Sequence, residues 1–171
     1  MSGRLQYDFQ VPENDSLKER LVKWKTRSDV EEDEYMKFFI LYIIFNAWLS
    51  VEAQQSRGRA KGDRDKINWL KGANSGLESY WSNLDLNPQL SDELLELERV
   101  NNLGTGVEHK FFEQRRDLES FAKVLEFVYT IRCNLFHGDK PYILVGRNHR
   151  LVKSGSGILN IWVEYILEDI E

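Results

Sequence analysis

The sequence predicts an all-α protein built as a helical bundle, on three observations. Apolar residues recur at helical spacing over long stretches, near 17–26, 35–49 and 118–135. Polar and glycine-containing segments separate those stretches, and no convincing sheet pattern is present. A chain of 171 residues can bury a substantial core without disulfides or metals. We therefore expect a single domain over 1–171, with a loose lead-in over 1–13.

The first two helices are predicted from their caps and their apolar faces. The polar run 14–16 can cap a first helix that ends near Thr26. Ser28 or Asp29 then caps a long second helix, whose first turn is rich in acidic residues that the helix dipole favours. The stretch 35–49 is apolar almost all round. Such a helix lies either at the centre of the core or in a surface shared with a partner subunit.

Shorter helices follow a polar, glycine-containing loop over 53–62. They are predicted over 63–72, over 77–84 and from about 91 to 101. The glycines at 104 and 106 interrupt the chain after the last of them. These helices link the long second helix to the next long stretch.

Asp117 caps a strongly amphipathic helix that Gly138 ends. Two interpretations fit the chain beyond it. Residues 142–145 are β-prone and could form a hairpin with the residues that follow. Alternatively, Asn148 caps a final helix. We expect the helix, because helical spacing of apolar residues persists to Ile170.

Composition and charge narrow the function classes. The net charge of -5 argues against a dedicated nucleic-acid coat protein, which would be basic. The charge is segregated, however. Residues 57–66 hold five basic and two acidic side chains, and residues 132–153 hold five basic and one acidic. An anionic ligand could use either region, although an ordinary solvated surface explains the first as well.

The single cysteine, Cys133, and the N-terminal sequence bear on location. One cysteine forms no intramolecular disulfide, which favours a reducing cytoplasm. Residues 1–10 contain no apolar segment typical of a signal peptide. The apolar stretch 36–49 is short and interrupted by Lys37 and Asn46, so it indicates a buried helix rather than a membrane span. We expect a cytoplasmic protein without a membrane partner.

Several common catalytic and cofactor motifs are absent from the sequence. It contains no phosphate-binding Walker loop, no G-x-G-x-x-G, no C-x-x-C and no H-E-x-x-H. Its three histidines are not at metal-ligand spacing, and one cysteine cannot build a zinc site. We therefore expect neither a metal nor an organic cofactor.

The segment 131–138, Ile-Arg-Cys-Asn-Leu-Phe-His-Gly, carries the most chemistry. An imidazole such as that of His137 titrates near neutral pH and can accept the proton of a ribose 2′-hydroxyl. The guanidinium of Arg132 can bind the adjacent phosphate and offset the charge that develops on it. These two groups suffice for metal-free cleavage of RNA by internal transesterification.

The spacing of Arg132 and His137 constrains how they could act together. Five residues apart on an ideal helix, they are rotated by roughly 140° from each other. Either Gly138 turns the chain at the helix end, or two copies of the segment face each other across a dimer. In a purely structural interpretation, Arg132 pairs with an acidic residue and His137 caps its own helix.

The segment 131–138 resembles the R-x4-6-H motif of the HEPN superfamily, here with four intervening residues. Trp24, the acid-rich run 29–34 and the aromatic stretch 39–48 are similar to the early long helix of that family. Residues 125–138 are similar to its motif-bearing helix. The resemblance implies an up-and-down bundle of four to five main helices that forms a homodimer. In catalytic members of the family, the two motifs face each other in a metal-independent endoribonuclease site.

The resemblance also assigns roles to individual residues. Arg132 and His137 would be the catalytic pair. Asn134 would orient His137 or contact the phosphate. Cys133 stands where many members have Asn, Asp or His, which puts that supporting role in doubt. Asn46, on the aromatic stripe of the second helix, could approach the site, although a buried interhelical hydrogen bond is the simpler interpretation.

Basic residues beyond the motif are candidates for contacts with RNA: Lys140, Arg147 and Arg150. Some HEPN toxins are silenced by a partner that modifies a tyrosine two residues after the motif histidine. Asp139 occupies that position here, so this mode of silencing is not expected. An antitoxin protein acting in another way stays open.

The resulting hypothesis is an HEPN-type endoribonuclease in a toxin-antitoxin or defence setting, which leaves a 2′,3′-cyclic phosphate. The alternative is a non-catalytic dimeric HEPN module that binds RNA or a partner protein. In a third interpretation, Arg132 and His137 are structural parts of a helical dimer.

Overall fold

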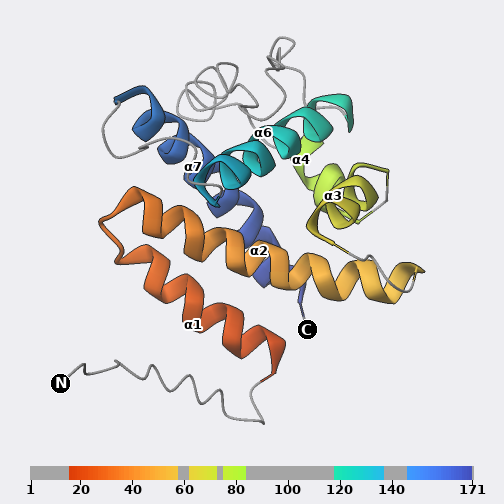
Figure 1. Ribbon diagram of the computed structural model, residues 1–171. Helices are drawn as coiled ribbons and strands as arrows, with labels where there is room; N and C mark the ends of the chain where they lie inside the picture. Colours follow the sequence, from red (N-terminus) through yellow and green to blue (C-terminus); the bar gives the residue numbers. More distant parts are fainter. Residues whose placement is uncertain (1–15, 58–61, 73–74, 84–117, 137–145, 171) are drawn as a thin grey trace, which may run out of the picture.

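The computed structural model describes residues 16–57, 62–72, 75–83, 118–136 and 146–170 (Figure 1). Within these ranges the chain forms six α-helices and no strand, which confirms the all-α prediction. The helices are α1 (Leu17–Asp29), α2 (Glu34–Arg57), α3 (Asp63–Gly72), α4 (Leu77–Asn83), α6 (Leu118–Phe136) and α7 (Gly146–Asp169).

Some expectations lie outside the described residues. These are the lead-in over 1–13, the helix near 91–101, the cap at Asp117, the stop at Gly138 and the β-prone stretch 142–145.

The start of α1 follows the sequence closely, because its cap is a reciprocal hydrogen-bonded pair. The hydroxyl of Ser16 accepts from the backbone amide of Glu19 at 3.2 Å. The carboxylate of Glu19 in turn accepts from the backbone amide of Ser16 at 2.8 Å. This capping box satisfies two amides that the first turn leaves unpaired.

The junction between α1 and α2 differs from the prediction. Helix α1 continues to Asp29, and the hydroxyl of Ser28 donates to the carbonyl of Lys25 at 2.7 Å inside that helix. Ser28 and Asp29 therefore do not cap α2. Asp33 does so instead, since its carboxylate accepts from the backbone amides of Tyr35 at 2.8 Å and Met36 at 3.1 Å. Several residues between Ser28 and Asp33 could cap α2. The position of the turn between α1 and α2 decides which of them does so.

The final helix is confirmed over the alternative hairpin for the described residues, but it begins earlier than expected. Helix α7 starts at Gly146, so Asn148 lies within it and is not its cap. Helices α3 and α4 begin where the sequence predicts, at Asp63 and Leu77.

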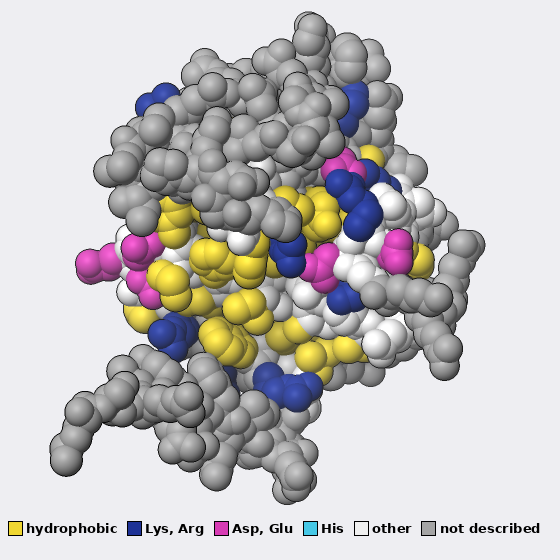
Figure 2. All heavy atoms as spheres, viewed as in Figure 1, with side chains coloured by type: hydrophobic (Ala, Val, Ile, Leu, Met, Phe, Trp, Pro, Cys, Tyr) yellow, Lys and Arg dark blue, Asp and Glu magenta, His cyan; other side chains and the backbone are white. Residues whose placement is uncertain are grey.

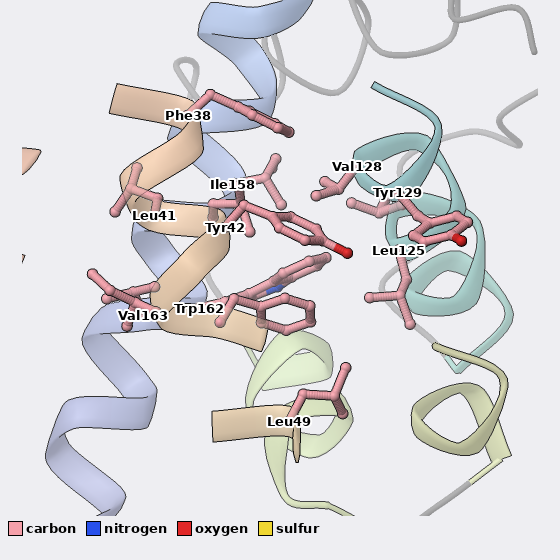
Figure 3. Packing of buried hydrophobic residues seen from close by; sticks show 14 of the residues in the cluster. Phe38, Leu41, Tyr42, Leu49, Leu125, Val128, Tyr129, Ile158, Trp162 and Val163 are labelled. Carbon is pink, nitrogen blue, oxygen red and sulfur yellow. The ribbon is translucent and has the colours of Figure 1, made fainter. Parts of the chain in front are cut away.

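Helix α2 is the centre of the described core. It packs against α1, α3 and α7, while α6 packs against α3, α4 and α7 (Figure 1). Figure 3 shows side chains of α2, α6 and α7 meeting in one cluster. The α2 members of that cluster are Phe38, Ile40, Leu41, Tyr42, Ile44, Phe45, Trp48 and Leu49. The interpretation of this helix as central to the core is therefore correct.

By length and apolar composition alone, the segment Glu34–Gln54 of α2 could cross a membrane. Its neighbours account for the same composition, because half of that apolar window is buried by other parts of the protein. A core helix covered on several sides needs the same apolar circumference as a membrane span.

Close packing of α7 on its neighbours depends on Gly155. A Cβ atom added at this position would lie 2.9 Å from a ring carbon of Phe38 on α2. It would also lie 3.1 Å from the Cδ1 of Ile131 on α6. Both neighbours are buried, with exposed fractions of 0% and 1%. The absence of a side chain here lets three helices approach one another.

We expect Gly155→Ala to be less stable than Gly72→Ala by about 1–3 kcal/mol, the cost of overpacking a rigid core. The better helix propensity of alanine, worth up to about 1 kcal/mol, benefits both variants. Urea unfolding measures the difference. Gly72→Ala is the control, because no heavy atom of the described chain lies within 4 Å of its added Cβ. A Gly155→Ala protein as stable as Gly72→Ala would contradict the close packing.

Candidate functional site

Arg132, on the last turns of α6, is held by an acidic residue from another helix. Its Nη2 donates to the Oδ2 of Asp63, at the start of α3, at 2.7 Å. The two side chains are 22% and 26% exposed, so the pair is only partly open to solvent. The other carboxylate oxygen of Asp63 lies 3.7 Å from the Nζ of Lys66. The arginine therefore has the acidic partner that the structural interpretation of the motif expects.

Aromatic rings complete the surroundings of the guanidinium. Its central carbon lies 4.5 Å from the centroid of the Phe136 ring and 5.8 Å from that of Tyr42. Phe136 packs edge-on against Phe39 of α2, with ring centroids 4.9 Å apart. A cation over an aromatic face is attracted by the ring quadrupole. We call Arg132, Asp63, Tyr42 and Phe136 the Arg132 cluster.

Burial and charge set the protonation states in the Arg132 cluster. Burial raises the pKa of Tyr42 strongly, and the negative charge of Asp63 raises it further. Figure 3 shows Tyr42 reaching from α2 toward α6. For Arg132, burial acts to lower the pKa. Interactions with Cys133, Tyr42 and Asp63 outweigh that effect, so the pKa is raised. The arginine is thus a permanent cation beside a neutral phenol.

The second motif residue, His137, lies outside the described residues and directly follows Phe136, the last described residue of α6. Lys140 also lies outside them. Arg147 belongs to the first turn of α7, but its side chain is not described, whereas Arg150 is exposed on the same helix.

The end of α6 and the start of α7 lie near the same part of α2. Phe136 of α6 packs on Phe39. One turn earlier in α2, the ring of Tyr35 lies 6.2 Å from that of His149 in α7. Arg150 follows His149 directly. The fold therefore places Arg150 near the start of α2, the same part of the molecule where α6 ends.

The supporting residues fall on different sides of the Arg132 cluster. Asn134 is 9% exposed and, two residues after Arg132, lies roughly 200° around the helix from it. Cys133 is partly buried and interacts with the side chains of both Tyr129 and Arg132, whose pKa values it raises. Cys133 is thus adjacent to the guanidinium, whereas Asn134 belongs to another face of α6.

Asn46 lies one turn after Tyr42 on α2 and is linked to α3 through its backbone. Its carbonyl accepts from the hydroxyl of Ser50 at 2.6 Å. Ser50 accepts in turn from the Nζ of Lys66 at 2.8 Å. Because Lys66 also lies near Asp63, this chain of contacts places Asn46 beside the α2–α3 contact.

Sequence reasoning missed several charged residues that the fold gathers beside the motif. In the sequence, Asp63 stands out only as the start of a predicted helix within a basic stretch. Glu126 of α6 pairs with Arg64 and Lys71 of α3, and Arg64 lies over the ring of Tyr129. Glu126, Tyr129 and Arg132 are spaced by three residues along one side of α6. This periodicity was visible, but nothing local identifies the partners on α3.

In the part of the chain that the structure describes, no three His, Cys, Asp or Glu side chains come together as a metal site would require. What the arrangement offers is a cation of fixed orientation. Arg132 is held by a carboxylate on one edge and by a ring across its plane. A guanidinium held in this way can recognise a phosphate oxygen with little further loss of side-chain freedom.

Comparison with protein-family models, with curated proteins and with solved structures found no match to this chain.

The raised pKa of Tyr42 predicts a specific loss of stability at high pH. In the unfolded chain the phenol ionises near its ordinary pKa of 10.0, whereas in the folded protein it stays protonated to a higher pH. Its contribution is therefore complete below pH 10 and is lost as the pH rises through the folded pKa. We expect a loss approaching about 1.4 kcal/mol per pH unit above pH 10.

Urea unfolding between pH 8 and pH 11 tests this expectation. Tyr42→Phe should lose less stability than wild type over that range, because it has no phenol to ionise. Tyr80→Phe is the control, since Tyr80 is only partly buried and its pKa rises less. Parallel curves for wild type and Tyr42→Phe would show that the Tyr42 phenol is not held neutral.

Proposed function

We propose that this chain is a metal-independent endoribonuclease of the HEPN type. The observation that carries the proposal is the setting of Arg132, a partly buried cation fixed by Asp63 and Phe136 at the end of α6. His137 follows that helix end directly. The four longest helices among the described residues are α1, α2, α6 and α7, which is consistent with an HEPN-like up-and-down bundle of four to five main helices.

In the proposed reaction, the ribose 2′-hydroxyl attacks the adjacent phosphorus. His137 accepts the hydroxyl proton as the new O2′–P bond forms. Arg132 stabilises the additional negative charge on the phosphoryl oxygens. The P–O5′ bond breaks, and the leaving 5′-oxygen takes up a proton from solvent or from the imidazole of a second copy. The products are a 2′,3′-cyclic phosphate and a free 5′-hydroxyl.

Asp63 already occupies part of the guanidinium that would bind the phosphate in this mechanism. A phosphate that approaches Arg132 either displaces the carboxylate or uses the guanidinium edges that Asp63 leaves free. A guanidinium carries five N–H donors, so one carboxylate does not saturate it.

The same ion pair favours a second candidate function. An arginine already neutralised by Asp63 suits a non-catalytic dimeric HEPN module that binds RNA or a partner protein. In that case Arg132 joins α6 to α3, and binding depends on other surfaces. Binding that persists unchanged after His137→Ala, without cleavage, distinguishes the module from the enzyme.

The proposal includes a homodimer formed through the outer face of α2. Met36 and Ile43 are each 45% exposed. Met36, Phe39 and Ile43 recur at helical spacing, so the three form one apolar surface, and Phe136 of α6 packs beside it on Phe39. Figure 2 shows hydrophobic side chains gathered over this part of the molecule. A second copy covering this surface would bring two α6 ends together.

We place the protein in the cytoplasm as a toxin or defence effector, with RNA as its substrate and no membrane partner. An antitoxin protein could restrain it by covering the same apolar surface. No cofactor enters the proposed reaction.

Cleavage of mixed single-stranded RNA in excess chelator tests the activity. We expect wild type to leave 2′,3′-cyclic phosphate ends. Arg132→Ala and His137→Ala should each lower the rate by about 100-fold or more, because each removes one stabilising or proton-transfer group. Circular dichroism verifies that both variants fold. Full cleavage by both folded variants would exclude this site.

Light scattering with size-exclusion chromatography tests the dimer. We expect Ile43→Glu to shift wild-type dimers to monomers, because a buried unpaired carboxylate opposes association. Val30→Glu is the matched control, since Val30 is 76% exposed in the turn after α1 and outside the α2 surface. A wild type that stays monomeric at all concentrations would contradict both the dimer and a composite site.

A further inference from the structure

A second group of charged residues lies beside the Arg132 cluster, where α3 meets α6. The Oε1 of Glu126 accepts from the guanidinium of Arg64 at 2.6 Å. The same oxygen also accepts from the Nζ of Lys71. We call Arg64, Lys71, Glu126 and Tyr129 the Glu126 cluster. Two cations thus share one carboxylate oxygen, and the cluster carries a net positive charge.

This excess positive charge is only partly solvated. The side chains of Glu126 and Lys71 are 18% and 26% exposed. Burial lowers the pKa of Lys71, and the neighbouring charge of Arg64 lowers it further. Repulsion between two cations on one carboxylate is relieved when a second anion arrives. The cluster is therefore better balanced with an anion bound than without one.

The geometry keeps Arg64 available to such an anion. Its guanidinium lies 4.4 Å from the centroid of the Tyr129 ring, and its side chain is still 46% exposed. The ring and Glu126 hold the planar group in place, so little side-chain entropy remains to be lost on binding. An arginine ordered on a ring and open on its edge suits a phosphate oxygen.

The two clusters are arranged in a row. Glu126, Tyr129 and Arg132 follow one another at intervals of three residues on α6, which spans about 9 Å along the helix axis. Arg64 lies over the ring of Tyr129, and the positive charges of Arg64 and Arg132 both act to lower the pKa of that phenol. Figure 2 shows Lys and Arg side chains interspersed with acidic ones over the α3 side of this face.

An exposed ring lies at one end of the row. Phe136 has Arg132 over its ring, and its side chain is 55% exposed. Unpaired bases stack on exposed aromatic side chains, whereas bases in a duplex are not free to do so. This ring favours a single-stranded ligand over a double-stranded one.

We propose that Arg64 and Lys71 bind a backbone phosphate of single-stranded RNA, adjacent to the phosphate that Arg132 engages. This inference rests on the proposed function for its ligand. Glu126 holds the two cations in position and competes with the phosphate for them. The RNA backbone follows the side of α6 that faces α3, and one base stacks on Phe136.

The proposal predicts opposite changes in RNA affinity when a cation of the Glu126 cluster is removed and when its carboxylate is neutralised. Arg64→Ala and Lys71→Ala remove a phosphate contact and weaken binding. Glu126→Gln removes the competing carboxylate and strengthens binding. A cluster that serves only to join α3 to α6 predicts no gain in affinity from Glu126→Gln.

Fluorescence anisotropy with a labelled 2′-O-methyl oligonucleotide, in chelator, measures this binding. The methylated probe keeps every phosphate but has no free 2′-hydroxyl, so wild-type protein cannot cleave it by the proposed route. Arg64→Ala and Lys71→Ala together should lower the slope of log Kd against log salt by about 0.7, the value for one phosphate contact on a single strand, and each alone should lower it by less. Glu126→Gln should lower Kd.

A paired cation on another helix provides the matched control. Lys25 of α1 contacts the Oδ1 of Asp29 at 2.5 Å. Lys25→Ala and Asp29→Asn repeat the same charge changes away from α3 and α6, and should leave the salt slope unchanged. Thermal unfolding of each variant verifies the fold, and the exposed Arg64 provides the substitution that disturbs packing least.

The outcomes separate this inference from the proposed function. Binding that depends on Arg64 and Lys71 without cleavage of ordinary RNA retains the phosphate site and overturns the nuclease. Cleavage with unchanged affinity and slope in Arg64→Ala and Lys71→Ala retains the nuclease and overturns the phosphate site. A wild type that does not bind the oligonucleotide, or a Glu126→Gln protein that binds more weakly, also overturns the phosphate site.

Discussion

The apolar circumference of α2 is the constraint from which the described arrangement follows. Because α2 is apolar almost all round over 35–49, other parts of the protein must cover most of its circumference there. Helices α1, α3 and α7 pack against it, and α6 reaches it through Phe136 on Phe39 and through Tyr42. Each neighbour then needs only one apolar face of its own. The charged side chains of the candidate site consequently lie where the neighbouring helices contact one another rather than on α2.

The contact between α3 and α6 is the clearest of these positions. Asp63 and Glu126 are the carboxylates there, and each interacts with two cations. The cations are Arg64, Lys66, Lys71 and Arg132. A contact designed only for stability would balance the charges, because an unmatched, partly buried cation is unfavourable. The anionic ligand that we propose would balance this surplus of positive charge.

The helices could be predicted from the sequence, but their partners could not. Periodicity located the helices because burial of an apolar face is a property of consecutive residues. The cap of α2 was misassigned, since several acidic residues near Asp29 can each cap a helix and only the turn decides among them. Arg132 could be identified as a candidate site residue because its guanidinium can bind a phosphate. Its pairing with Asp63, 69 residues away, depends on how α3 packs and leaves no local signal. The same holds for Glu126 with Arg64 and Lys71.

The close contact at Gly155 has a consequence for the motif as well as for the core. Ile131, which limits the space at Gly155, immediately precedes Arg132 in α6. A larger residue at Gly155 would crowd Ile131 and therefore bears on the position of the residue that follows it, Arg132. The packing distances among α2, α6 and α7 therefore help to set the position of Arg132 at the surface. A substitution of a buried residue can weaken the Arg132 cluster even when every side chain of that cluster is unchanged.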